Sequence, residues 1–219
     1  ESTRNAVSHN HQINIQQGGK NSSMGAFLNY TDQQGVMLNN YMKRINAKMA
    51  YDAKPTKWLS TSINMLVNHT WANEVHETGG AQYPRRTMIE FVPWLPVTLD
   101  SEWTNHRTPA DAINLEGMAN PVHTLKTLEN MNYRTKLFGN AAFIFHLAPG
   151  LDLRTQIGGE GNLFQSKVYF PNDLVDLTYP DGRVDYRDSR TYYWQEETYL
   201  TYNKVVGNHR INAMAGLSW

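Results

Sequence analysis

The chain has 219 residues, no cysteine, and 20 basic side chains (Lys and Arg) against 20 acidic ones (Asp and Glu). This length permits one or two domains. The balanced charge argues against a protein that binds nucleic acid by neutralising phosphates. The lack of cysteine excludes disulfides and thiolate metal sites.

The two ends of the sequence do not look like the ends of a complete protein. The first residues, ESTRNAVSHN, lack the basic start and apolar core of a signal peptide. The last residues, RINAMAGLSW, stop within an alternating pattern without a turn or a helix cap. We therefore expect an internal fragment of a longer protein rather than a chain whose signal was removed.

Three segments near the start alternate between apolar and polar residues: His9–Gln17, Met24–Thr31 and Arg44–Asp52. Period-two alternation predicts strands with one apolar face. Short turns are expected at Gly18–Ser23 and Lys54–Lys57, which contain glycine, serine or proline.

The charged face of the third segment bears on what surrounds it. This face carries Arg44, Lys48 and Asp52. A soluble sandwich would have to bury these charges in its core, whereas a membrane sheet can turn them toward a watery lumen.

Leu59–Trp71 shows the clearest alternation in the chain. Its apolar face includes Ile63, Met65 and Val67, and the residues between them are mostly small and polar. The pattern lasts for about thirteen residues, roughly twice a typical soluble strand. Such a strand is near the length needed to cross a bilayer obliquely.

The second half of the chain is expected to hold two long loops and four more strands. The loops are placed at about 73–132 and 162–189, and Asn120 followed by Pro121 predicts the start of a short helix in the first loop. The strands are expected near 136–147, 151–158, 192–204 and 209–217, with tight turns near Pro149 and Gly207.

The expected architecture is therefore an all-β, antiparallel, up-and-down transmembrane β-barrel segment. Its tight links, near Lys20, Pro55, Pro149 and Gly207, alternate with longer connections. Short turns at one end and long loops at the other are typical of an outer-membrane barrel. A soluble all-β protein with one wet face is the alternative, and the charged strand face disfavours it.

Three stretches resemble, in the expected order, the SusC/RagA family of TonB-dependent outer-membrane transporters. MGAFLNYTDQQG to NMLVNHT, residues 24–70, is similar to an early barrel region of that family, with its Lys-Arg strand and Lys-Trp-Leu turn. NPVHTLKTLENMNYRTKLFGNAAF, residues 120–143, resembles the family's Asn-Pro to Asn-Tyr-Arg-Thr segment. TYLTYNKVVGNHRINAMAGLSW, residues 198–219, resembles its Leu-Thr-Tyr-Asn-Lys hairpin.

This resemblance implies a larger protein. The chain would supply about eight strands of a barrel of roughly 22 strands, while the plug domain and the remaining strands lie outside it. The implied function is TonB-dependent import of an oligosaccharide or a peptide across the outer membrane. The implied partners are a SusD-like surface lipoprotein, TonB, the rest of the barrel and plug, and outer-membrane lipid.

The first long loop contains the candidate binding residues Tyr83, Arg85, Arg86, Trp94 and Trp103. Aromatic planes and charged hydrogen-bonding groups at the outer mouth could hold a sugar or a peptide. Packing of the loop, or contact with a partner, is the favoured interpretation of the same residues. Trp58 and Trp194 are expected in interfacial aromatic girdles.

We expect neither an enzyme nor a cofactor or metal site. His9 and His11 could share a strand face, but no carboxylate lies near them in the sequence. No Gly-x-Ser-x-Gly nucleophile motif occurs. Two other functions stay open: a non-transporting surface protein, such as an adhesin or a carbohydrate-binding β-protein, and a passive porin.

Overall fold

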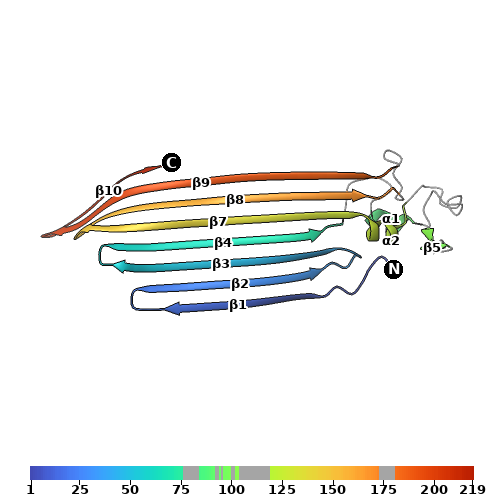
Figure 1. The fold of residues 1–219 in the computed structure, drawn as a ribbon, viewed down its shortest axis with the longest axis horizontal. Coiled ribbons are helices and arrows are strands. Elements are labelled where there is room, and N and C mark those ends of the chain that lie inside the picture. The colour runs from blue at the N-terminus through green and yellow to red at the C-terminus, as the bar shows by residue number, and fades with distance from the viewer. Residues whose placement is uncertain (76–83, 92–93, 95, 100–101, 104–118, 173–180) are drawn as a thin grey trace.

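The computed structural model describes residues 1–75, 84–91, 94, 96–99, 102–103, 119–172 and 181–219. One long antiparallel sheet dominates it, with the strand order β1-β2-β3-β4-β7-β8-β9-β10. Each strand lies beside its neighbour in sequence, and the tight turns gather at one end of the sheet (Figure 1). Helices α1 and α2 and the small ribbon β5–β6 lie at the other end (Figure 1).

The strands of the sheet are long, and several exceed the usual length of soluble strands. Their bounds are β1 (Ser8–Gly18), β2 (Ser22–Gln34), β3 (Tyr41–Thr56), β4 (Leu59–Asn73), β7 (Glu129–Ala148), β8 (Leu151–Phe170), β9 (Arg183–Val206) and β10 (His209–Ser218). The other elements are α1 (Pro84–Glu90), β5 (Thr98–Leu99), β6 (Glu102–Trp103) and α2 (Pro121–Thr127).

The predicted up-and-down arrangement of eight strands is confirmed, and the tight links near Lys20, Pro149 and Gly207 lie where they were expected. Gly150 and Gly207 have φ values of 81° and 60°. Glycine adopts this left-handed backbone without strain, at the second turn residue after Pro149 and at the first turn residue before Asn208.

The turn predicted at Lys54–Lys57 is displaced, because β3 continues to Thr56 and the turn residues are Lys57 and Trp58. The strand register shifts between Ala53 and Thr56. Proline has no backbone N–H to donate to the ladder, so Pro55 produces a bulge within the strand instead of ending it.

The second long loop was predicted at 162–189, and this was wrong in extent. Strand β8 continues to Phe170 and β9 begins at Arg183. In the added part the outward positions mix apolar residues such as Leu163 and Val184 with polar ones, and Gln165 donates a hydrogen bond of 3.1 Å to Asp188 across the two strands. The apolar alternation is therefore interrupted in this part of the hairpin, while its backbone pairing continues.

The helix predicted at Asn120 is confirmed as α2. The Asn120 side chain accepts hydrogen bonds from the backbone N–H groups of Val122 and His123, 3.0 and 3.2 Å away. Pro121 occupies the first turn, where its missing N–H has no cost. No helix in the described part of the chain is long and apolar enough to cross a membrane.

Strand register assigns the side chains of the sheet to two faces. Met49, Met65, Gly139 and Gly159 occupy one row, because each residue pairs with the next across β3, β4, β7 and β8. Residues paired in this way project from the same side of a sheet, and their neighbours in sequence project from the other. We call the side of Met65 the outer face and the opposite side the luminal face.

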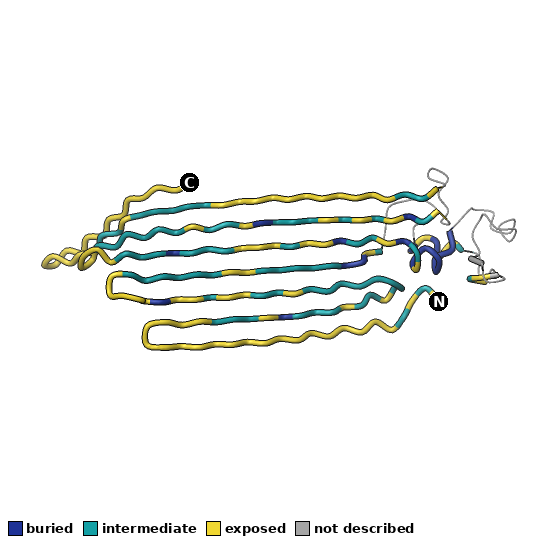
Figure 2. Tube along the Cα trace, in the orientation of Figure 1, coloured by how far each residue is buried: buried dark blue, intermediate teal, exposed yellow. Residues whose placement is uncertain are grey.

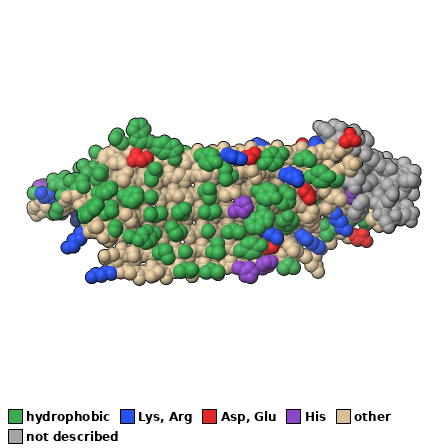
Figure 3. All heavy atoms as spheres, in the orientation of Figure 1, with side chains coloured by type: hydrophobic (Ala, Val, Ile, Leu, Met, Phe, Trp, Pro, Cys, Tyr) green, Lys and Arg blue, Asp and Glu red, His purple; other side chains and the backbone are tan. Residues whose placement is uncertain are grey.

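The outer face carries an apolar surface that no described residue covers. Ile13, Met65 and Ile157 are 59, 50 and 53 % exposed, respectively. Figure 3 shows hydrophobic side chains spread across the strands of the viewed face. Such a broad exposed apolar surface fits contact with lipid and would be an aggregation hazard in water.

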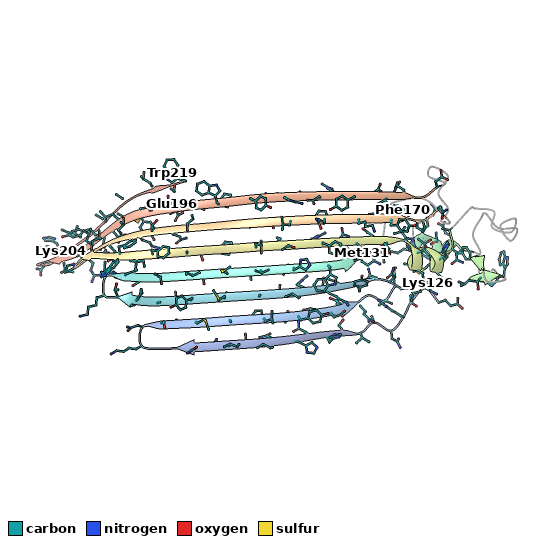
Figure 4. The ribbon with its side chains drawn as sticks, in the orientation of Figure 1. Lys126, Met131, Phe170, Glu196, Lys204 and Trp219 are labelled. Carbon is teal, nitrogen blue, oxygen red and sulfur yellow. The ribbon has the colours of Figure 1, made fainter. Side chains whose placement is uncertain are left out.

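A carboxylate lies within this apolar surface. Glu196 lies on the outer face, paired with Ile157 of β8. Its side chain accepts hydrogen bonds from the hydroxyl groups of Thr155 and Thr198, at 3.3 and 2.5 Å. Figure 4 shows Glu196 beside Trp219, whose backbone pairs with it. These bonds offset part of the cost of a polar group at this position.

The buried core lies at the loop end rather than within the sheet. Val122, Leu125 and Leu128, in or next to α2, are buried, as is Phe170 at the end of β8. Figure 2 shows the same distribution, with buried positions concentrated at the helices and exposed ones along β1, β9 and β10. A single sheet has no second layer to pack against, so its apolar face needs lipid.

The two faces predict opposite effects of the same new charge on adjacent residues. We expect Met65→Arg, in the full-length protein, to lower the free energy of unfolding by about 2–4 kcal/mol, the cost of arginine facing lipid near the bilayer centre. Asn64→Arg places the same charge on the luminal face and is expected to cost less than about 1 kcal/mol. Urea unfolding in lipid vesicles measures both, and equal losses would contradict the assignment of the faces.

Candidate functional site

The luminal face is the candidate functional surface, since it is the polar side of a sheet whose other side is apolar. A row of amides crosses it: Gln12, Asn29, Asn46 and Asn68 pair in turn across β1 to β4. Asn46 donates to the side-chain oxygen of Asn29 at 3.3 Å, and Asn68 donates to that of Asn46. Bonded in this way, the amides form an ordered and uncharged polar wall.

Toward the loop end, the next row is cationic. Arg44 pairs with Thr70, and Thr70 pairs with Arg134, so the two arginines flank one threonine on β4. Lys136 is the next residue of β7 on the luminal face after Arg134, and it pairs with Asn68. Together with amide side chains, these residues line a groove of about 420 Å³, which we call the cationic groove.

A pair of apolar side chains lies next to the cationic groove, on the side of the tight turns. Leu66 and Phe138 pair directly across β4 and β7, and they are 41 and 46 % exposed. Lys48 and Glu160 flank this apolar pair in the same row, so the luminal wall presents cations, amides and then a mixed row with an apolar centre.

A second hollow, of about 490 Å³, lies nearer the turns. Small side chains form much of its lining, including Ser23, Ser60, Ser62 and Ala142. Asp52 and cations that include Lys54 and Arg154 also line it, and Arg154 donates to Gln156 at 2.9 Å. The lining of this hollow is therefore also positive overall, but small side chains make up more of it than of the cationic groove.

A buried asparagine fixes the loop end of the sheet. Asn73, at the end of β4, is 4 % exposed. Its side chain donates to the carbonyl of Asn39 and accepts from the N–H of Asn130, both at 2.8 Å. Its backbone carbonyl accepts from the Asn40 side chain at 3.3 Å. One residue therefore joins the β2–β3 connection, β4 and the start of β7.

The five candidate loop residues are only partly described. Arg85 and Arg86 lie exposed on α1, and Arg86 forms an ion pair of 2.7 Å with Glu90 one helical turn away. Trp94 is 69 % exposed. Trp103 lies in β6, paired with Thr98, and Tyr83 falls outside the described residues. Their role in binding stays a prediction.

The predicted girdle tryptophans both lie exposed. Trp58 occupies the turn between β3 and β4 and stacks on Phe145, with ring centroids 6.2 Å apart. Trp194 projects from the outer face of β9 and is 66 % exposed. The position of Trp58 among the tight turns suits an interfacial region of a bilayer, whereas Trp194 lies in the same row of the sheet as Met65 and Gly159.

Sequence reasoning missed the cationic groove. Its residues come from β3, β4 and β7, and about 90 positions separate Arg44 from Arg134. The alternation of Arg44 and Lys48 indicated a luminal strand face, but only the pairing of β4 with β7 brings the second arginine beside the first.

Length, alternation and topology define the chain as a segment of a transmembrane β-barrel. No model of a known protein family matches the sequence. The chain is 24 % identical over 217 residues to the TonB-dependent receptor P3 of Formosa agariphila, covering 96 % of this chain and 21 % of that receptor. It therefore spans about a fifth of the length of the curated relative that it matches.

Solved structures of the RagAB peptide transporter share the fold. One superimposes with a TM-score of 0.72 at 16 % identity, covering 96 % of this chain and 24 % of that one. The open-open state gives a TM-score of 0.70 at 14 % identity, over 97 and 24 % of the two chains. The closed-closed state gives 0.69 at 16 % identity, over 96 and 24 %.

These similarities agree with the resemblance to SusC/RagA transporters seen in the sequence. The chain is similar in sequence to part of a TonB-dependent receptor and shares its fold with a segment of the RagAB transporter. The relatives are a receptor and a transporter, in agreement with the prediction that the chain is not an enzyme.

The Asn73 network predicts where the sheet opens first when it is disturbed. Asn73→Ala would leave the N–H of Asn130 and the carbonyl of Asn39 without their partner, at a cost of about 1–3 kcal/mol for each buried group. We expect faster amide hydrogen exchange at residues 38–40 and 129–131, with no change at the tight turns. Asn64→Ala, on the same strand, serves as the control and is expected to leave exchange at the loop end unchanged.

Proposed function

We propose that the protein imports a nutrient across the outer membrane in a TonB-dependent process, and that this chain forms part of the barrel wall. The division of one tall sheet into an apolar outer face and a polar luminal face carries the proposal, because a solute-conducting barrel requires both faces. The similarity to a TonB-dependent receptor supports the energy source.

The proposal extends to the rest of the protein. Strands β1 and β10 each have one neighbour in the sheet, so each leaves an edge that would lack backbone partners in lipid. Further strands must cover these edges, and we propose a barrel of roughly 22 strands around a plug domain. TonB would act on the plug, displacing it to open the lumen.

A SusD-like surface lipoprotein is the proposed partner at the loop end. The long connection between β4 and β7 and the shorter one between β8 and β9 both lie at that end of the sheet (Figure 1). The RagAB peptide importer has been solved in open-open and closed-closed states, which supports a transporter complex that opens and closes. Arg85, Arg86 and Trp94 are exposed there and are candidates for contact with the partner or the cargo.

The cargo class is the finer part of the proposal. An oligosaccharide or a peptide fits a lumen lined with amides, hydroxyls and cations, because all of these groups form hydrogen bonds with either cargo. The RagAB relatives transport peptides, which favours a peptide without deciding the class.

Deletion of the full-length gene tests the proposal. We expect the deletion to abolish uptake of at least one member of a panel of labelled oligosaccharides and peptides, and the intact gene to restore it. Uptake by the complemented strain should stop when the proton gradient is collapsed, because TonB draws its energy from that gradient.

Two outcomes would contradict this function. Uptake that survives collapse of the gradient would indicate a passive porin. Unchanged uptake of the whole panel after deletion, together with loss of nutrient binding at the cell surface, would indicate a non-transporting surface protein.

A further inference from the structure

The cationic groove holds positive charges without the acidic partners that accompany cations elsewhere at the same end of the sheet. On the outer face, Lys43 lies 3.5 Å from Asp32, and Arg190 lies 3.1 Å from Asp188. In the described part of the chain, none of Arg44, Arg134 and Lys136 forms an ion pair with a carboxylate.

The arginines of the groove have weak contacts in place of ion pairs. The Nη2 atom of Arg44 lies 3.4 Å from the Met42 sulfur, a weak acceptor, and the buried Nε atom has no hydrogen-bond partner. The guanidinium of Arg134 lies over the ring of Phe164, 5.3 Å from its centroid. Stacking orients this guanidinium but leaves its in-plane donors available to an anion.

The spacing of the cations suits one ligand. Arg44 and Arg134 occupy strands on either side of β4, so their backbones lie about 10 Å apart, two strand spacings. In the structure the Arg134 guanidinium turns toward Phe164 of β8, and a ligand placed over the intervening Thr70 would draw it toward Arg44. Gln33, Asn40 and Asn132 surround them with amides that can bind the uncharged part of the same ligand.

The charge of the groove is positive overall. Among the described residues, Glu74 is the one acidic side chain that lines it, against Arg44, Arg134 and Lys136. Like charges held close together repel one another, and an anion placed among them removes that repulsion. A carboxylate can also accept two parallel hydrogen bonds from one guanidinium.

We propose that the cationic groove is a specificity site for cargo that carries carboxylate groups. The inference rests on the proposed import function, because it assigns the groove to the cargo that enters the lumen. The groove lies on the luminal face toward the end where the long connections gather, which is the extracellular end of such a barrel. Cargo from outside would reach the cationic groove before the Leu66–Phe138 pair and the hollow near the turns.

Direct binding to the detergent-solubilised, full-length protein tests the site with two matched pairs of probes. One pair is hexagalacturonate and its methyl ester, and the other is hexaglutamate and the corresponding glutamine peptide. We expect at least one carboxylated probe to bind tenfold or more tightly than its neutral counterpart, with a preference that weakens as salt is added. The responding pair shows whether the carboxylate belongs to a glycan or a peptide.

Two triple variants locate the preference. Arg44→Gln, Arg134→Gln and Lys136→Gln together are expected to lower carboxylate binding to the level of the neutral probe. Lys20→Gln, Lys57→Gln and Arg210→Gln remove the same charge at the turn end and should leave the tenfold preference intact. Equal losses in the two variants would show a general charge effect and overturn the site.

Two other results would also overturn the inference. One is the absence of any preference for the carboxylated probe in both pairs. The other is a groove variant that melts at lower temperature yet keeps its carboxylate preference, which would indicate that the cations pair with an acidic part of the plug. Gradient-dependent uptake is measured separately. Loss of the carboxylate preference with uptake retained would contradict only the role of the cationic groove, whereas loss of uptake itself would contradict the import function.

Discussion

Backbone hydrogen bonding is the constraint on which the rest of this structure depends. In hydrocarbon, every peptide N–H and C=O must find a partner within the protein. The eight strands meet this requirement through successive antiparallel pairings, which leave only the outer edges of β1 and β10 open. Because side chains alternate along each strand, a register that satisfies the backbone also assigns each residue to lipid or to the lumen.

This assignment places apolar side chains on one face of the sheet and polar side chains on the other. Lipid takes the place of a second packing layer, so Ile13, Met65 and Ile157 are exposed without penalty in the membrane. The conventional core is confined to α2 and the strand ends around Leu128 and Phe170, where the chain leaves the bilayer and must exclude water by its own packing.

Alternation in the sequence located all eight strands and the capping pattern located α2, because both are local signals. It failed at the outer ends of β8 and β9, where polar residues such as Gln165 and Asp188 interrupt the apolar face although the strands stay paired. Pro55 suggested a turn but lies in a bulge, since β3 stays paired with β4 as far as Thr56. The five candidate loop residues were predicted from their composition. The cationic groove instead depends on the pairing of β4 with β7, which lie on either side of the long connection.

The pairing of β4 with β7 also links the cationic groove to the buried Asn73 at the loop end of the sheet. Asn40 and Asn132 line the groove, and Asn73 bonds to Asn40 and to Asn130, two residues before Asn132. The side chains that surround the cations are therefore held by bonds that also tie β4 to β7 and to the β2–β3 connection. A site held in this way loses little conformational freedom when a ligand arrives, so more of the interaction energy is retained as affinity. The selectivity proposed for the lumen would thus have the same physical origin as the integrity of the barrel wall, namely the register of β4 against its two neighbours.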